Sequence, residues 1–149
     1  MPHILVVEAP YYADITEELT RGALAELDAQ GATHERETVF GVFEIPAAIS
    51  MAKTVRNADG SPKFDGYLAL GCVIRGETTH YDYVCNESAR GLMDLSVRDH
   101  LAIGYGVLTV ENEDQAWARA RVDDKNKGRD AAAACLRMIA LRGHFGLSI

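Results

Sequence analysis

The chain has 149 residues, of which 48% are hydrophobic, and its formal net charge is −7. This length can bury a hydrophobic core without disulfides or a structural metal, so we expect a single domain over residues 1–149. The acidic balance argues against a nucleic-acid partner, whose binding depends on clustered positive charge. No apolar run approaches the roughly 20 residues that span a bilayer, so we expect a cytoplasmic protein without a membrane partner.

The three cysteines form an odd set without a C-x-x-C pair. Cys72, Cys85 and Cys135 each fall in an apolar strand or helix pattern. We therefore expect small core residues in a reducing compartment, and no disulfide framework.

The apolar pattern of the first half predicts strands alternating with helices. A β-branched run at residues 4–7 predicts a strand, and apolar residues then recur at helical spacing from Ile15 until Gly31. Residues 33–39 alternate weakly, as in a second strand. Pro46 suits the first turn of a helix that reaches about Val55.

The second half continues the alternation. Residues 57–62 read as a loop, and residues 64–74 are mostly apolar, as in a parallel strand covered on both faces. The elements expected after it are a helix at 80–99, a strand at 105–110, and helices at 113–120 and 125–141. This order implies right-handed crossovers and a parallel sheet between two helix layers.

The junction between the expected strand at 64–74 and the expected helix at 80–99 is the most informative segment of the sequence. In α/β proteins, ligands bind where such strands end. We expect Gly76 to allow a sharp turn, and Thr78 or Thr79 to cap the helix that follows. Free amides at a helix start attract an anion such as phosphate, and the imidazole of His80 can exchange protons near neutral pH. An ordinary junction with a solvated histidine is the competing interpretation.

Other chemistries fit the sequence poorly. His80 and Asp82 point to different sides of a helix and no H-E-x-x-H motif is present, so we expect no metal site. No G-x-S-x-G elbow accompanies a nucleophile. The first strand runs into Glu8, Ala9, Pro10 instead of a glycine-rich turn, which disfavours a dinucleotide cofactor.

Four blocks resemble the lumazine synthase family and follow the order found in that family. They are residues 41–46 (GVFEIP), 70–84 (LGCVIRGETTHYDYV), 106–112 (GVLTVEN) and 115–120 (QAWARA), the last leading to 126–128 (NKG). The resemblance extends from His3 to near Gly143. It implies a flavodoxin-like three-layer α/β/α sandwich with a four-stranded parallel sheet. It also implies a cofactor-independent condensation of 5-amino-6-(D-ribitylamino)uracil with 3,4-dihydroxy-2-butanone 4-phosphate, a step of riboflavin biosynthesis.

The resemblance also implies roles for individual residues. His80 would be the acid/base, Arg119 would steady the departing phosphate, and Lys127 would lie near the pyrimidine carbonyl. Substrate-binding positions would be Tyr11, Val42, Phe43, Glu44, Cys72, Val73, Ile74, Glu77, Thr78 and Tyr105. Tyr11 would stack on the ring, while Phe43 and Glu44, at the end of the second strand, would contact the ring and the ribityl hydroxyls.

In the family, the aromatic residue at the position of Tyr105 belongs to the neighbouring subunit, so the resemblance implies a homo-pentamer with active sites at its interfaces. The connector at residues 121–126 lacks the glycines of shell-forming members. Glycine reaches backbone angles closed to Asp or Val, so we expect a free pentamer, single or paired face to face with another, and no shell.

The sequence departs from the family pattern at two positions, and both departures concern ligand affinity. Pro10 stands where many members carry Gly or Arg, and Tyr11 replaces the more usual Phe or Trp. A catalytically weak relative that binds flavin or lumazine in the same slot is the alternative function. The joint presence of His80, Arg119 and Lys127 favours the enzyme, because a pure binder needs no acid/base.

Overall fold

The computed structural model describes residues 1–147. Its elements are β1 (His3–Ala9), α1 (Ala13–Ala29), β2 (Thr33–Thr38), the short 3₁₀ helix η1 (Val42–Glu44), α2 (Ile45–Ala52), β3 (Gly66–Ile74), α3 (His80–Arg98), β4 (Ile103–Val110), α4 (Glu113–Ala120) and α5 (Lys127–His144). All strand pairs are parallel, in the order β2-β1-β3-β4. Within residues 1–147, no helix combines the length and apolar character needed to cross a membrane.

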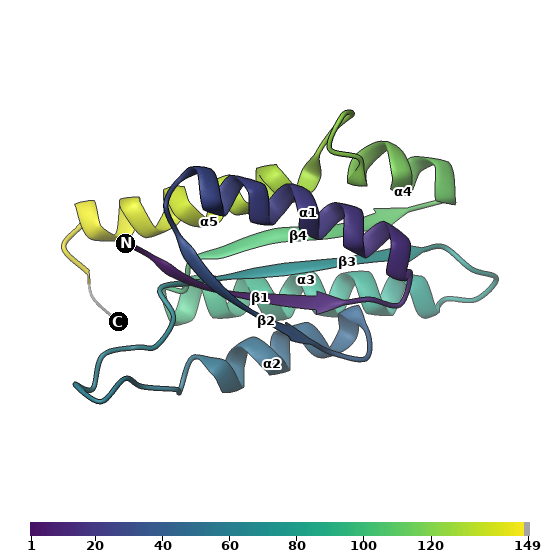
Figure 1. The fold of residues 1–149 in the computed structure, drawn as a ribbon. Coiled ribbons are helices and arrows are strands. Elements are labelled where there is room, and N and C mark those ends of the chain that lie inside the picture. Colours follow the sequence, from purple (N-terminus) through teal and green to yellow (C-terminus); the bar gives the residue numbers. More distant parts are fainter. Residues whose placement is uncertain (148–149) are drawn as a thin grey trace.

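The sheet lies between two helix layers, which confirms the predicted α/β/α sandwich. Helices α1, α4 and α5 cover one face, and α2 and α3 cover the other (Figure 1). Successive side chains of a strand point to opposite faces of the sheet, so they alternate between the two cores. Ile4 and Val6 of β1 pack toward α1 and α5, whereas Leu5 and Val7 pack on the opposite side.

The third strand has the burial that its apolar run predicted. Residues 66–72 are all buried, with Leu68 and Leu70 in one core and Tyr67 and Ala69 in the other. Because this strand is central in the sheet and helix layers cover both of its faces, no polar alternation is needed. The strand therefore delivers residues 72–74 to one end of the sheet.

Helix α5 lies very close to the sheet and to α1, and two glycines make this possible. A Cβ at Gly104 of β4 would overlap the carbonyl of Ala131, and a Cβ at Gly128 of α5 would overlap the carbonyl of Leu19 in α1. The backbone approach is therefore closer than any side chain would permit. These contacts set the separation of the helix layer from β4.

Two local expectations were wrong. Phe43 and Glu44 do not end the second strand, because β2 stops at Thr38 and both residues lie in η1. At Gly76, a Cβ would meet nothing within 4 Å, and the φ angle is not in the left-handed region. The turn before α3 therefore does not require glycine on steric grounds.

The connector before α5 reaches a left-handed conformation without glycine. Asn126 has φ 47°, and its side chain accepts a hydrogen bond from the amide of Arg129 at 3.4 Å. Asparagine tolerates this region better than other non-glycine residues. The expectation of a free pentamer depends on the Asp and Val positions of the connector and not on Asn126. Val122, Asp123 and Asp124 do not have positive φ, and the mode of assembly stays a prediction.

Candidate active site

An open cleft of about 440 Å³ lies where β1 and β3 end. We call it the central cleft. It is lined by Tyr11, Tyr12, Phe40, Gly41, Val42, Phe43, Glu44, Cys72, Val73, Ile74, His80 and Val84. Three loops or strand ends that are distant in sequence thus meet at the start of α3, at the carboxyl edge of the sheet where ligands bind in this class of fold.

A buried ion pair lies where the loops that border the central cleft leave the sheet. The carboxylate of Glu8, 4% exposed, accepts hydrogen bonds from Nε and Nη2 of Arg36 at 2.9 and 2.8 Å, and from the hydroxyl of Thr20 at 2.8 Å. The amide of Val39 donates to the carbonyl of Glu8 at 2.9 Å. Since a buried charge is tolerated only when it is paired, this contact fixes the ends of β1 and β2 relative to each other.

Exposed aromatic side chains surround the central cleft. Tyr11 is 70% exposed, Phe43 56% and Phe40 85%. Aromatic rings provide flat faces for offset stacking with a planar ligand. Sequence reasoning identified Tyr11 and Phe43 but missed Phe40 and Tyr12. An apolar residue directly before the GVFEIP block, in a predicted loop, was the available signal for Phe40.

His80 is the first residue of α3 and is exposed. Its backbone amide donates to the hydroxyl of Thr78 at 3.3 Å, so Thr78, one residue before the N-cap, satisfies the first amide of the helix. Thr79 occupies the N-cap position without a side-chain hydrogen bond. Among residues 1–147 the imidazole has no hydrogen-bond partner, which leaves both ring nitrogens available to a ligand.

Several predicted site residues lie outside the central cleft of their own chain. Glu77 and Thr78 lie in the exposed turn before His80. Tyr105 lies on the edge strand β4. Arg119 of α4 donates to the carbonyl of Gln115 at 3.0 Å, and Lys127, at the start of α5, pairs with Asp130 at 3.3 Å. Tyr105, Arg119 and Lys127 therefore belong to elements on the β4 side of the molecule.

Cys72 lines the central cleft as a residue, but its side chain is buried in the same core as that of Cys135. Burial raises the pKa of Cys72 from 9.0 to about 11 and that of Cys135 to about 12. Both thiols are therefore protonated near neutral pH. They act as apolar packing groups, in agreement with the expectation for these two cysteines, and Cys72 is not a nucleophile in this state.

These raised pKa values predict a loss of stability in alkali. The folded chain retains protons that the unfolded chain releases above about pH 9, so the stabilisation is complete below pH 9 and is lost as the pH rises toward 11–12. We expect the free energy of unfolding in urea, at fixed protein concentration, to fall from pH 9 to pH 11. Cys135→Ala should show a shallower fall. An unfolding free energy that stays level over this range would contradict the assignment.

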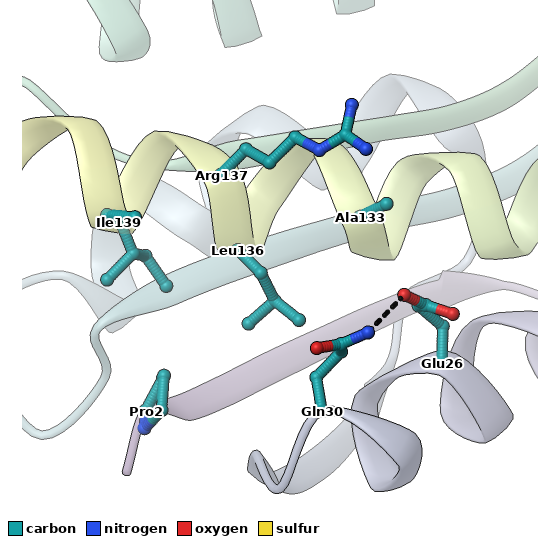
Figure 2. Close-up of a pocket in the computed structure, with 8 residues that line it drawn as sticks. Pro2, Glu26, Gln30, Ala133, Leu136, Arg137 and Ile139 are labelled. Carbon is teal, nitrogen blue, oxygen red and sulfur yellow. Dashed lines mark hydrogen bonds between the residues drawn. The ribbon is translucent and has the colours of Figure 1, made fainter.

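A second cavity, of about 540 Å³, lies between α1 and α5. Figure 2 shows Leu136 and Ile139 on α5 facing this space, with Glu26 and Gln30 at the end of α1, hydrogen-bonded to each other at 3.1 Å. None of the predicted site residues lines it. Among residues 1–147, no three His, Cys, Asp or Glu side chains are grouped so as to hold a metal ion. The central cleft is therefore the candidate active site.

Comparison with known proteins identifies the family of the chain. Residues 2–143 match the family model described as 6,7-dimethyl-8-ribityllumazine synthase. The chain is 54% identical over 145 residues to the protein of that name from Bartonella tribocorum, covering 97% of this chain and 93% of the relative. It is 54% identical to the one from Agrobacterium fabrum, covering 97% of both chains, and 55% identical to 6,7-dimethyl-8-ribityllumazine synthase 1 of Rhizobium meliloti, covering 97% and 94%. The chain belongs to the 6,7-dimethyl-8-ribityllumazine synthase family.

Proposed function

We propose that the chain condenses 5-amino-6-(D-ribitylamino)uracil with 3,4-dihydroxy-2-butanone 4-phosphate to form 6,7-dimethyl-8-ribityllumazine, and that the central cleft is the site. The observation that carries this proposal is the cleft itself, in which exposed aromatic faces and the free imidazole of His80 meet inside the region that matches the family. Planar recognition and proton transfer are two of the three requirements of this reaction, and binding of the phosphate is the third.

The pyrimidine would occupy the part of the cleft between the aromatic residues and the end of β3. Tyr11 and Phe43 offer ring faces. The backbone of residues 72–74 pairs with β4 but lies past the last β1–β3 pair at Gly71, so it offers amides and carbonyls on its β1 side. Glu44 is exposed beside them, and a carboxylate can accept hydrogen bonds from several ribityl hydroxyls. The substrate would therefore lie along the carboxyl edge of the sheet.

The phosphate-bearing substrate would lie beside the start of α3. The amine attacks the ketone and a first water is lost as the imine forms, phosphate is then eliminated, and the second ring closes with loss of a second water. These steps need proton transfers, for which His80 is placed at the edge of the central cleft. The phosphate would bind the amides of the turn that contains Glu77 and Thr78, where the helix start favours negative charge.

We further propose that a neighbouring copy completes each site. Tyr105, Arg119 and Lys127 do not line the central cleft of their own chain, and all three come from β4, α4 and α5. A head-to-tail ring brings the β4 side of one copy to the cleft of the next, and the resemblance implies that the ring is a pentamer. A monomer would then lack the cation for the phosphate.

The cytoplasm is the compartment that we propose for this activity. Cys72, Cys85 and Cys135 are free thiols. Disulfides are rare in reducing compartments, and two of these thiols are used as core residues. We also propose that the chain works as one domain, since the matched region includes every strand of the sheet.

One assay tests the function and the assembly together. The purified protein is mixed with both substrates, and formation of the fluorescent lumazine is followed while sedimentation velocity measures the mass of the active species. We expect turnover by a particle of five chains or a pair of such rings. Binding of the pyrimidine without product would instead indicate the weak relative. Hollow shells as the dominant species would contradict the free pentamer.

Replacing Arg119 by alanine should weaken binding of the phosphate-bearing substrate by about 10- to 100-fold, because a charge-assisted hydrogen bond is lost. Pyrimidine affinity should change little. Separate titrations with each substrate measure the two effects. Arg21→Ala is the control, since Arg21 is an exposed arginine of α1 paired with Glu18 at 2.9 Å. Equal losses for both substrates would contradict the assignment of Arg119 to the phosphate.

A further inference from the structure

Arg75 belongs to the VIRG block, yet the proposed reaction gives it no role. Its backbone amide donates to the carbonyl of Val110, the last residue of β4, at 3.0 Å. Its side-chain Nε donates to Glu111 at 2.9 Å, and Nη2 donates to Asp82 at 3.3 Å. The guanidinium carbon also lies 4.2 Å from the centre of the Tyr81 ring. One residue thus connects the ends of β3 and β4 with the first turn of α3.

The turn between β3 and α3 has few other contacts. Residues 75–80 are all exposed, and a Cβ at Gly76 would touch nothing. The N-cap residue Thr79 makes no side-chain hydrogen bond, and the bond from the His80 amide to Thr78 lies inside the turn. The first buried side chain of α3 is Val84, one turn after His80. Tyr81, in the first turn of α3, lies against the Arg75 guanidinium and also hydrogen-bonds Thr109 of β4, so the start of the helix is anchored to the sheet through Arg75 together with Tyr81.

Direct contact of Arg75 with the phosphate is disfavoured by the same geometry. The guanidinium already faces two carboxylates, those of Glu111 and Asp82, and one of its faces lies against Tyr81. Two negative charges exceed its single positive charge, so the group presents no net attraction to an anion. Arg75 is also not among the residues that line the central cleft.

We infer that Arg75 is a positioning residue for the reaction, which holds the turn at residues 76–79 and the start of α3 so that His80 stays at the edge of the central cleft. This inference rests on the proposed function. Exposed ion pairs contribute little to global stability, so the loss of Arg75 should loosen the turn without unfolding the protein. A displacement of about 1 Å at a catalytic group can lower a rate by about 100-fold.

The test compares Arg75→Gln with Arg21→Gln. The control removes an arginine that is bonded to Glu18 at 2.9 and 3.0 Å within α1, away from the turn. For Arg75→Gln we expect kcat to fall by about 10- to 100-fold, with little change in KM for the pyrimidine. Hydrogen exchange of the amides of residues 77–80 should become at least several-fold faster, as for a locally opened segment. Arg21→Gln should leave both measurements unchanged.

A second variant separates positioning from a general structural role. Asp82→Asn removes one partner of Arg75 and should lower kcat in the same direction, and the double variant should lose no more than Arg75→Gln alone. Additive losses, or a kcat for Arg75→Gln within twofold of the unaltered protein, would overturn the inference. If the unaltered protein made no lumazine, the proposed function would fail. The exchange rates would still decide whether Arg75 holds the turn.

Discussion

Replacing His80 by alanine should slow lumazine formation by about 10²- to 10⁴-fold, the usual contribution of a positioned acid/base. The effect should fall on kcat more than on the affinity for either substrate, because a proton transfer is made in the transition state. Fold and assembly should persist, since the side chain is exposed and its imidazole has no partner among residues 1–147. Steady-state kinetics with both substrates measures the loss.

His144→Ala is the matched control for His80→Ala. His144 is also an exposed helical histidine, but it lies in the last turn of α5 and outside the central cleft. Its replacement should leave kcat within about twofold of the unaltered enzyme, since surface changes away from a site have small effects. Turnover by His80→Ala at the rate of the control would show that another group carries the protons.

Replacing Gly128 by alanine should lower the free energy of unfolding by about 3 kcal/mol, at the upper end of the cost of overpacking. The added methyl group would overlap the carbonyl of Leu19 and lie 3.0 Å from the amide nitrogen of Ala23, both in the backbone of α1. A helix backbone cannot rotate aside as a side chain can, so α5 must move away from α1. Urea unfolding at fixed protein concentration measures the difference.

Gly143 provides a control in the same helix. A Cβ at Gly143 would meet nothing within 4 Å, and its φ angle is not in the left-handed region. Gly143→Ala should therefore be neutral or slightly stabilising, by at most about 1 kcal/mol, because alanine favours the helix. Equal stability of the two variants would show that α1 and α5 can separate at little cost. If Gly128→Ala, but not Gly143→Ala, also abolished lumazine formation, the result would indicate that the contact of Gly128 with α1 positions the neighbouring residue Lys127.

Local patterns were sufficient for most of the secondary structure. The apolar run at residues 64–74 predicted a strand covered on both faces, and residues 66–72 are buried. Helical spacing predicted α1 and α3 to within a few residues at each end. Such patterns succeed because the periods of two and about 3.6 residues are properties of short segments. The alternation of strand and helix then restricts the sheet to parallel arrangements.

The sequence by itself thus determined the elements, the layered class of fold and, through two of the family blocks, several of the residues that line the central cleft, among them Phe43, Ile74 and His80. Only the tertiary structure decided which of them meet within one chain. In the structure, Tyr11, Phe43 and His80 line the central cleft of one chain, whereas Arg119 and Lys127 lie outside it. The tertiary structure also placed the aromatic ring of Phe40 at the cleft and gave Arg75 its partners Asp82 and Glu111. These outcomes depend on strand order and on the close approach of backbones, which are set by the packing of the whole sheet and are not encoded in the period of any one segment.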